Sequence, residues 1–215
     1  YLQTCGYDVQ SLEVDTQGRI DPEDLAEGLR RAKGRVALVS VMFANNEIGN
    51  LYPISLLANI AHQHGALFHT DAVQAVGKIP VDVRALGIDL LSLSAHKFHG
   101  PKGIGALYVR SGTPLDPVLR GGHQERGVRC GTYNTAGILG LGAACALAQE
   151  RLINPDHFVH LRGLRDALED GILKRVPGSW VNGAPRPSRV PNTSCLGFLG
   201  ITGWDLAAAR LAIST

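Results

Sequence analysis

The sequence has little of several features that mark whole classes of protein. Only 6% of its 215 residues are aromatic, and its 21 lysines and arginines nearly balance its 19 acids. This small net charge, with 45% apolar residues, excludes a disordered chain. No basic block or aromatic-studded basic stripe indicates a nucleic-acid surface. No run approaches about 18 consecutive apolar residues, so we expect no transmembrane helix and no membrane partner.

Cysteine is also scarce, and no metal-binding pattern is present. The four cysteines are Cys5, Cys130, Cys145 and Cys195. They form no Cys-x-x-Cys pair and no zinc spacing, so we interpret them as reduced thiols. This favours a cytoplasmic location, or a mitochondrial one in a eukaryotic source. His62 and His64 lie two residues apart in an expected helix and do not share a face, so no metal site is predicted.

The two ends of the sequence indicate a piece of a longer protein. Residue 1 is Tyr, and the segment Tyr7–Val14 already alternates like a strand. The segment Trp204–Thr215 begins a helical pattern and stops without a capping signal. We therefore expect a fragment that lacks both ends of its parent chain.

Strand-like and helix-like segments alternate along the chain. The expected helices are 21–33, 53–65, 135–152 and 155–176, and the expected strands are 36–43, 66–70, 89–94 and 103–110. Residues 36–43 form a continuous apolar run, which predicts a strand buried on both faces. The order strand, helix, strand predicts a mostly parallel sheet, with 103–110 as the candidate antiparallel strand. Residues 177–191 are rich in Pro, Gly, Ser and Arg and are the best candidate for a linker.

Polar side chains follow three of the expected strands. They are Asn45 and Asn46, Asp71 with Gln74, and Ser94 with His96 and Lys97. Wound sheets bind ligands at the carboxyl ends of their strands, so these groups are expected to converge. A lysine amine, a carboxylate and a set of small donors suit pyridoxal phosphate. The amine forms a Schiff base, the carboxylate keeps the pyridine nitrogen protonated, and the donors hold the phosphate.

Each of these residues also has a plain structural explanation. Asp71 can cap the turn that follows its strand, because Asp is a favoured cap. Lys97 can be a solvated surface lysine. The pair Asn45-Asn46 can consist of turn residues and nothing more.

Two glycine-rich segments allow other interpretations. Gly100–Gly105 has neither the GxxxxGK[ST] nor the GxGxxG pattern, so it supports nucleotide binding only weakly. The loop with Arg126 and Arg129 fits an anion site and a solvated turn equally well.

Four ordered segments together resemble the class V aminotransferase family, and within it the cysteine desulfurases of the NifS/IscS type. They read "VSVMFANNEIGNLYPI", "FHTDAVQAVGKIPVDV", "LLSLSAHKFHGPKGIGALYVR" and "GGHQERGVRCGTYNT". The resemblance implies an α/β, aspartate aminotransferase-like transferase fold, with a mostly parallel central sheet wrapped by helices and the start of a smaller α+β domain. It assigns residues 1–135 to the large cofactor domain, 136–176 to connecting long helices, and 177–215 to the truncated small domain.

The resemblance also implies a role for each site residue. Lys97 looks like the Schiff-base lysine, and Asp71 looks like the partner of the pyridine nitrogen. Gln74 would hydrogen-bond the ring oxygen, and Asn46 would contact the ring region and the substrate.

The remaining implied roles concern the phosphate. Ser94 and His96 look like phosphate ligands within the chain. Thr132 is similar to the threonine that reaches the phosphate held by the neighbouring subunit, which implies a homodimer with shared active sites.

The chain departs from the family pattern in places. The family usually has Gly at Ala95, Tyr at His99 and Gly at His123. Its phosphate-binding turn and ring-stacking His would precede this sequence. Its catalytic Cys follows a small-Ser-Ser/Thr-Gly stretch that residues 213–215 resemble, so we expect that Cys just past the last residue.

The implied activity is cysteine desulfuration. L-Cysteine would become L-alanine, with Lys97 as the base and an enzyme persulfide carrying sulfur to an acceptor such as an iron–sulfur scaffold, or to thiolation. A selenocysteine lyase, acting on L-selenocysteine, fits the same site. An inactive domain with only a dimerisation role is the other alternative, and we expect these 215 residues alone to be inactive.

Overall fold

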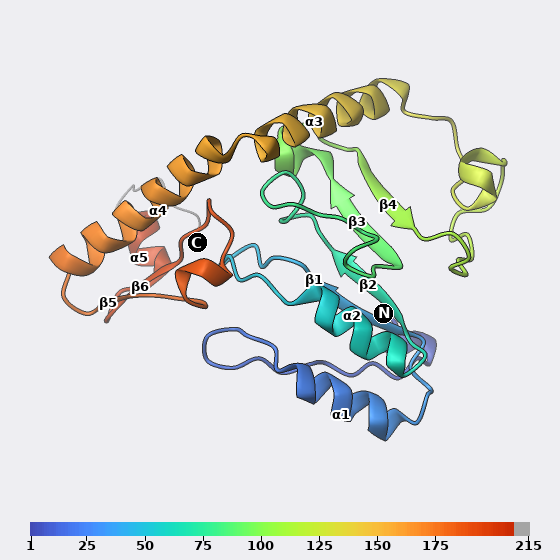
Figure 1. Cartoon of the computed structure of the whole chain (residues 1–215), viewed down its shortest axis with the longest axis horizontal. Coiled ribbons are helices and arrows are strands. Elements are labelled where there is room, and N and C mark those ends of the chain that lie inside the picture. Colours follow the sequence, from blue (N-terminus) through green and yellow to red (C-terminus); the bar gives the residue numbers. More distant parts are fainter. Residues whose placement is uncertain (209–215) are drawn as a thin grey trace.

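The computed structural model describes residues 1–208, and its main sheet has four strands (Figure 1). Strands β1 (Leu38–Met42), β2 (Leu67–Asp71) and β3 (Leu90–Ser94) run parallel in that order. Strand β4 (Gly105–Val109) pairs antiparallel with β3. The predicted α/β class, with a mostly parallel sheet, is confirmed.

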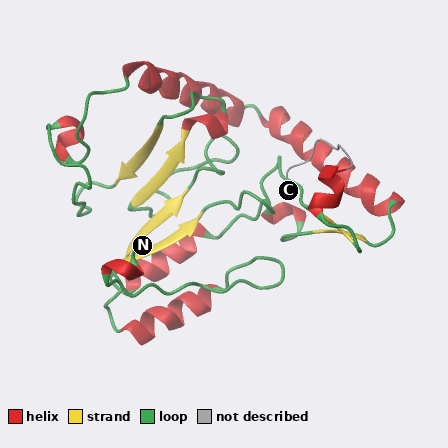
Figure 2. Ribbon diagram, turned by 180° about the vertical axis from the view of Figure 1, so that it is seen from behind, coloured by secondary structure: helices red, strands yellow, loops and turns green. Residues whose placement is uncertain are grey.

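Helices α1 (Pro22–Ala32) and α2 (Ile54–Gln63) cover one side of this sheet (Figures 1 and 2). Helix α1 begins where its sequence predicts, because the Asp21 side chain accepts a hydrogen bond from the Glu23 N–H at 2.9 Å and Pro22 occupies the first turn. It ends at Ala32, and Lys33 caps it in a left-handed conformation, one residue before the expected Gly34. Side chains of both helices form the core with the inner sheet face, and they include Leu25, Leu29, Ile54, Leu57, Val39, Val41 and Phe68.

The other side of the sheet is open among the described residues. Along β1 the buried Val39 and Val41 alternate with Leu38, which is 46% exposed, and with the exposed Ser40. The prediction that 36–43 is buried on both faces is therefore wrong. An apolar run signals two-sided burial only if helices cover both faces, and in residues 1–208 they cover one.

Two further corrections concern strands. The alternating segment Tyr7–Val14 forms no strand, because no neighbouring segment within the described chain offers it a ladder. Conversely, the expected linker 177–191 contains strand β5 (Ser179–Val181), which pairs antiparallel with β6 (Leu196–Phe198) in a separate sheet.

Two long helices connect the sheets. Helix α3 (Thr135–Ile153) and helix α4 (Pro155–Arg175) are separated by one residue, Asn154. Asn154 ends α3 and begins α4, where its side chain accepts a hydrogen bond from the Asp156 N–H at 3.0 Å. Helix α5 spans Gly203–Ala208. The short 3₁₀ turns are η1 (Gln3–Cys5), η2 (Ala95–Phe98), η3 (Gln124–Gly127) and η4 (Arg186–Ser188). The proposed domain boundaries stay a prediction.

Helix α3 has the length and composition of a membrane span, with mean hydropathy 1.3 and 17% of its residues buried. The expectation that the protein has no transmembrane helix, drawn from the longest apolar run, stays a prediction. The hydropathy comes from the Ala, Leu, Ile and Cys residues of the stretch 136–148, which polar residues flank at both ends. One such helix is weak evidence for a span, because apolar helices of protein cores pass the same test.

Candidate functional site

The carboxyl ends of three strands lie in register at one edge of the sheet. Met42 of β1 pairs with Asp71 of β2, and Asp71 pairs with Ser92 of β3. The ladder continues into the loops, since the Phe43 N–H donates to the Asp71 carbonyl at 2.8 Å and the Ala72 N–H donates to the Ser92 carbonyl at 2.9 Å. The predicted site residues that follow β1, β2 and β3 therefore start from a common edge.

Asp71 is the last residue of β2 and its side chain is exposed. Its Oδ1 accepts a hydrogen bond from the Val73 N–H at 2.9 Å, so it caps the turn after the strand. A carboxylate has a second oxygen, and no partner of Oδ2 is found within residues 1–208. Capping and ligand binding are thus compatible at this residue.

Lys97 lies in η2, directly after β3. The turn is anchored by its buried neighbours Ala95 and Phe98, while Lys97 and His96 are exposed. Ser94 Oγ and His96 Nδ1 are 2.9 Å apart and form a hydroxyl–imidazole pair beside the lysine. Ala95 does not have a positive φ, so alanine fits where the family has glycine. A side chain on Gly100 would instead meet the Ala95 Cβ at 2.8 Å.

The two asparagines after β1 have different surroundings. Asn45 Oδ1 accepts hydrogen bonds from the Glu47 and Ile48 N–H groups at 2.9 Å, and its own N–H donates to the Asn50 carbonyl at 2.8 Å. It is a turn residue, as the plain interpretation allowed. Asn46 is exposed at the top of this closed turn, which we call the Asn46 turn (residues 45–50).

Thr132 is apart from the other candidates. It lies in the exposed loop before α3, and within residues 1–208 no hydrogen bond joins it to them. In the same loop Arg129 donates to the Cys130 carbonyl at 3.0 Å and stays exposed. The role assigned to Thr132 concerns a second subunit and stays a prediction.

His69 is a polar group at this sheet that the sequence interpretation missed. Its Nδ1 lies 2.7 Å from Ser40 Oγ and its Nε2 lies 2.9 Å from Ser92 Oγ, so this imidazole on β2 joins one hydroxyl on β1 and one on β3. Burial lowers the pKa of His69, and the charge of Asp71 partly opposes this. The available signal was its position two residues before Asp71, because alternate residues of a strand share a face.

Lys78 was missed as well. It donates a hydrogen bond to Gln74 Oε1, and its pKa is lowered by burial and by the neighbouring charge of Lys97. The turn that carries both residues packs against η2, since a side chain on Gly77 would meet the Phe98 Cβ at 2.7 Å. An ammonium only donates, so it engages the amide oxygen and leaves the Gln74 nitrogen available as a donor. The spacing of four residues from Gln74 was the signal in the sequence.

The donor set at this edge fits pyridoxal phosphate in kind. It offers an exposed lysine amine, a carboxylate oxygen that has no partner in the described part of the chain, an amide donor and a hydroxyl–imidazole pair. Within residues 1–208 no cluster of three or more His, Cys, Asp or Glu is placed to hold a metal. The assignment of individual roles to these residues stays a prediction. Residues 213–215, which resemble the stretch before the family's catalytic Cys, lie outside the described residues.

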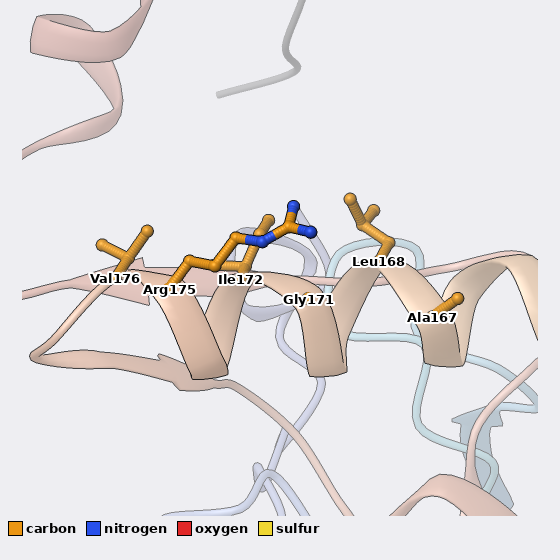
Figure 3. A pocket seen from close by; sticks show the side chains of 6 residues that line it. All are labelled: Ala167, Leu168, Gly171, Ile172, Arg175 and Val176. Carbon is orange, nitrogen blue, oxygen red and sulfur yellow. The ribbon is translucent and has the colours of Figure 1, made fainter.

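A shallow apolar groove lies elsewhere, along α4 (Figure 3). It is lined by Ala167, Leu168, Gly171, Ile172, Arg175 and Val176. None of the candidate residues borders it, so it is not part of this site.

Comparison with known proteins gives one consistent result. The family model described as aminotransferase class-V matches residues 2–209. A cysteine desulfurase of Cereibacter sphaeroides is 55% identical over 193 residues, which are 90% of this chain and 48% of that protein. The cysteine desulfurase NifS of Azotobacter vinelandii is 50% identical over 203 residues, 94% of this chain and 49% of that protein.

The fold agrees with these sequence matches. A crystal structure of a NifS-like protein from Rickettsia africae superposes with a TM-score of 0.85 at 34% identity, covering 94% of this chain and 56% of that one. The chain thus spans about half the length of the curated relatives it matches.

Proposed function

The chain belongs to the class V aminotransferase family, and from this membership we propose that the whole protein is a pyridoxal phosphate-dependent cysteine desulfurase. Relatives that are about half identical over most of this chain are named cysteine desulfurases, which supports L-cysteine as the substrate. Their names favour this activity over selenocysteine lyase. The structural observation that supports the proposal most is the register of β2 and β3. In this register Asp71 and the end of the strand that leads to Lys97 lie at one edge of the sheet.

Pyridoxal phosphate, when bound, would withdraw electrons from the Cα of the amino acid. The amine of Lys97 would take the Cα proton, which requires it to be neutral at that moment. The Asp71 carboxylate would hold the proton of the pyridine nitrogen through its free Oδ2, while Oδ1 keeps the turn closed.

The other residues bind and orient. The Gln74 amide would donate to the ring oxygen, because Lys78 engages its carbonyl oxygen. Ser94 and His96 would donate to the phosphate as a pair. Asn46, exposed on its turn, would contact the ring region and the substrate.

Sulfur transfer would need a thiolate that attacks the substrate sulfur and becomes a persulfide. None of the four cysteines in this sequence matches the family position, so the proposal places that Cys outside these 215 residues. The persulfide would pass sulfur to an acceptor protein for iron–sulfur cluster assembly or thiolation. All four cysteines are free, which supports a reducing compartment, cytoplasmic or, in a eukaryotic source, mitochondrial.

Replacement of Lys97 tests the proposal. In the whole protein, Lys97→Ala should abolish sulfide release from cysteine and the covalent fixation of cofactor by borohydride, because the only amine assigned to both tasks is gone. Lys102→Ala, which removes an exposed lysine nearby, is the matched control and should keep both. Sulfide release or borohydride fixation that survives in Lys97→Ala would reject the assignment.

The rival functions give different outcomes. A selenocysteine lyase would release selenide from selenocysteine and little sulfide from cysteine. A domain that only dimerises would not shift the absorption band of added pyridoxal phosphate.

A further inference from the structure

The Asn46 turn is held from outside by a distant segment of the chain. The Val190 N–H donates to the Gly49 carbonyl at 2.8 Å, and the Leu51 N–H donates to the Ser188 carbonyl at 2.8 Å. These bonds form an antiparallel bridge in which Asn50 faces Arg189. The backbone around Arg189 therefore sets where the turn ends.

Asn50 closes the same contact with its side chain and is 1% exposed. Its Nδ2 donates to the carbonyls of Gln17 at 2.7 Å and Gly18 at 3.0 Å, and its Oδ1 accepts from the Ala184 N–H at 2.7 Å. Three segments far apart in the sequence thus meet at one amide.

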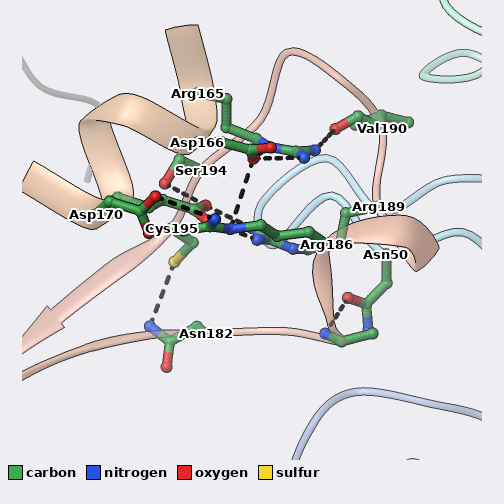
Figure 4. A network of polar contacts seen from close by, with 12 residues as sticks. Asn50, Arg165, Asp166, Asp170, Asn182, Arg186, Arg189, Val190, Ser194 and Cys195 are labelled. Atoms are coloured by element: carbon green, nitrogen blue, oxygen red, sulfur yellow. Dashed lines mark hydrogen bonds and ion pairs between the residues drawn. The ribbon is translucent and has the colours of Figure 1, made fainter. Parts of the chain in front are cut away.

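Helix α4 fixes the bridging segment through a buried ion pair (Figure 4). Arg189 donates to Glu169 through Nη1 at 2.8 Å and Nη2 at 2.9 Å, and Glu169 is fully buried. Ser194 Oγ also donates to Glu169, at 2.9 Å, and Arg165 donates to the Val190 carbonyl at 2.8 Å. Burial alone would raise the pKa of Glu169, but the bonds from Arg189 and Ser194 outweigh it and lower the pKa.

Stability alone does not account for this arrangement. A buried ion pair loses its hydration, and packed apolar residues of similar volume often serve stability as well or better. What such a pair gives in addition is direction, because two parallel hydrogen bonds fix the guanidinium in one plane. The guanidinium fixed in this way belongs to Arg189. Its two neighbours in the chain, Ser188 and Val190, are the residues hydrogen-bonded to the turn.

We propose that Glu169 is a positioning residue, which holds Arg189 so that the 188–190 segment sets the Asn46 turn against the carboxyl edge of the sheet. This inference rests on the proposed function for the role of Asn46, but not for the mechanical coupling. Helix α4 is thereby tied to the part of the site that would meet the substrate.

The test is Glu169→Gln in the whole protein, with Asp170→Asn as the matched control. Glu169 also accepts a hydrogen bond from Arg186 Nε at 3.1 Å. Asp170 is the next residue and shares this partner, but its side chain is 65% exposed. Amide hydrogen exchange of the cofactor-free protein is the first measurement. Exchange at Glu47 and Ile48 should rise on the order of tenfold in Glu169→Gln, with no change in β2 or α2, and Asp170→Asn should match the parent.

Steady-state kinetics provide the second measurement. The KM for cysteine should rise on the order of tenfold with a smaller change in kcat, since a displaced turn loses substrate contacts while Lys97 stays in place. Glu169→Asp, which keeps the charge, should recover part of the loss.

A buried Gln beside Arg189 can prevent folding, so a second variant keeps the test decisive. Glu169→Leu with Arg189→Met replaces the pair by apolar groups and should fold. A folded variant of either kind with unchanged exchange at the turn and unchanged KM overturns the inference, as does an equal effect of Asp170→Asn. Loss of all desulfurase activity in the parent protein would reject the proposed function and leave the exchange result to decide the coupling.

Discussion

At the scale of single residues, several side chains at the sheet edge serve structure and chemistry together. Asp71 uses one oxygen to close its turn, and within residues 1–208 its other oxygen has no hydrogen-bond partner. Gln74 is bonded through its oxygen by Lys78, which leaves its nitrogen to donate. From the sequence, a structural role and a ligand-binding role were alternatives for such residues. The geometry allows one side chain to serve both roles.

His69 makes stability depend on pH. Burial holds its pKa below the ordinary value of 6.5, so the unfolded chain takes up a proton more readily than the folded one. Stability should therefore fall as pH drops through 6.5 toward the lowered value in the folded protein. Urea unfolding between about pH 8 and pH 5 should show a smaller loss in His69→Gln than in the parent, because that variant lacks the group that titrates.

The control for this prediction is His160→Gln, which removes an exposed histidine on α4. It should follow the parent at every pH. Equal pH slopes for the parent and for His69→Gln would contradict the prediction.

At the scale of elements, local signals placed the helices and non-local contacts decided the strands. Asp21 with Pro22, and Asn154 with Pro155, mark helix starts within a few residues, so sequence was enough. The three residues of β5 form a strand only because they pair with β6, and no local pattern in the sequence predicts this pairing.

The junction of β3 and β4 gives an element-scale prediction. A Cβ at Gly105 would come within 2.5 Å of the Leu93 carbonyl oxygen, which is backbone and has no rotamer to yield. Gly105→Ala should force β4 away from β3 beside η2 and lower the free energy of unfolding by about 1–3 kcal/mol. Thermal or urea unfolding measures this loss.

Gly28→Ala is the matched substitution, because a Cβ there meets nothing within 4 Å inside helix α1. It should raise stability by about 0.5–1 kcal/mol. A destabilised Gly28→Ala, or a neutral Gly105→Ala, would show that local space does not control these positions.

At the scale of the whole molecule, the sequence predicted the α/β class, the strands along the chain and the common edge at which β1, β2 and β3 end. It did not predict which sheet face is open, because the apolar run of β1 looks the same whether one or two layers cover it. Nor did it indicate Glu169 and Arg189 as partners, since they are twenty positions apart with strand β5 between them. Pairing across such a distance depends on the fold and leaves no spacing rule.

Thr132 carries a prediction about assembly. If it serves the site of a neighbouring subunit, Thr132→Ala and Lys97→Ala should each be inactive as pure proteins. Mixed dimers should regain part of the activity, because one of their two sites combines an intact Lys97 with an intact Thr132 from the other chain. Sulfide release after the two variants are unfolded and refolded together measures this recovery.

The control is a mixture of Lys97→Ala with Asp71→Ala, whose defects fall on residues assigned to one chain. Each mixed dimer would then have two damaged sites and stay inactive. No recovery with Thr132→Ala, although mixed dimers are present by mass, would assign Thr132 to its own subunit or to no site.

The single-residue junction at Asn154 determines how a displacement of α3 is transmitted to α4. One residue ends α3 and begins α4, so no loop separates the two helices. The direction of α4 therefore depends on how α3 packs, and α3 packs through Ala144 and Ala148 against Phe98, next to Lys97. The 21 residues of α4 make a lever arm of about 30 Å. Because Glu169 ties the far part of this helix to Arg189, a tilt that starts where α3 contacts Phe98 is transmitted to residues 188–190. A core substitution under α3 should therefore disturb the Asn46 turn, although the two are far apart in the sequence.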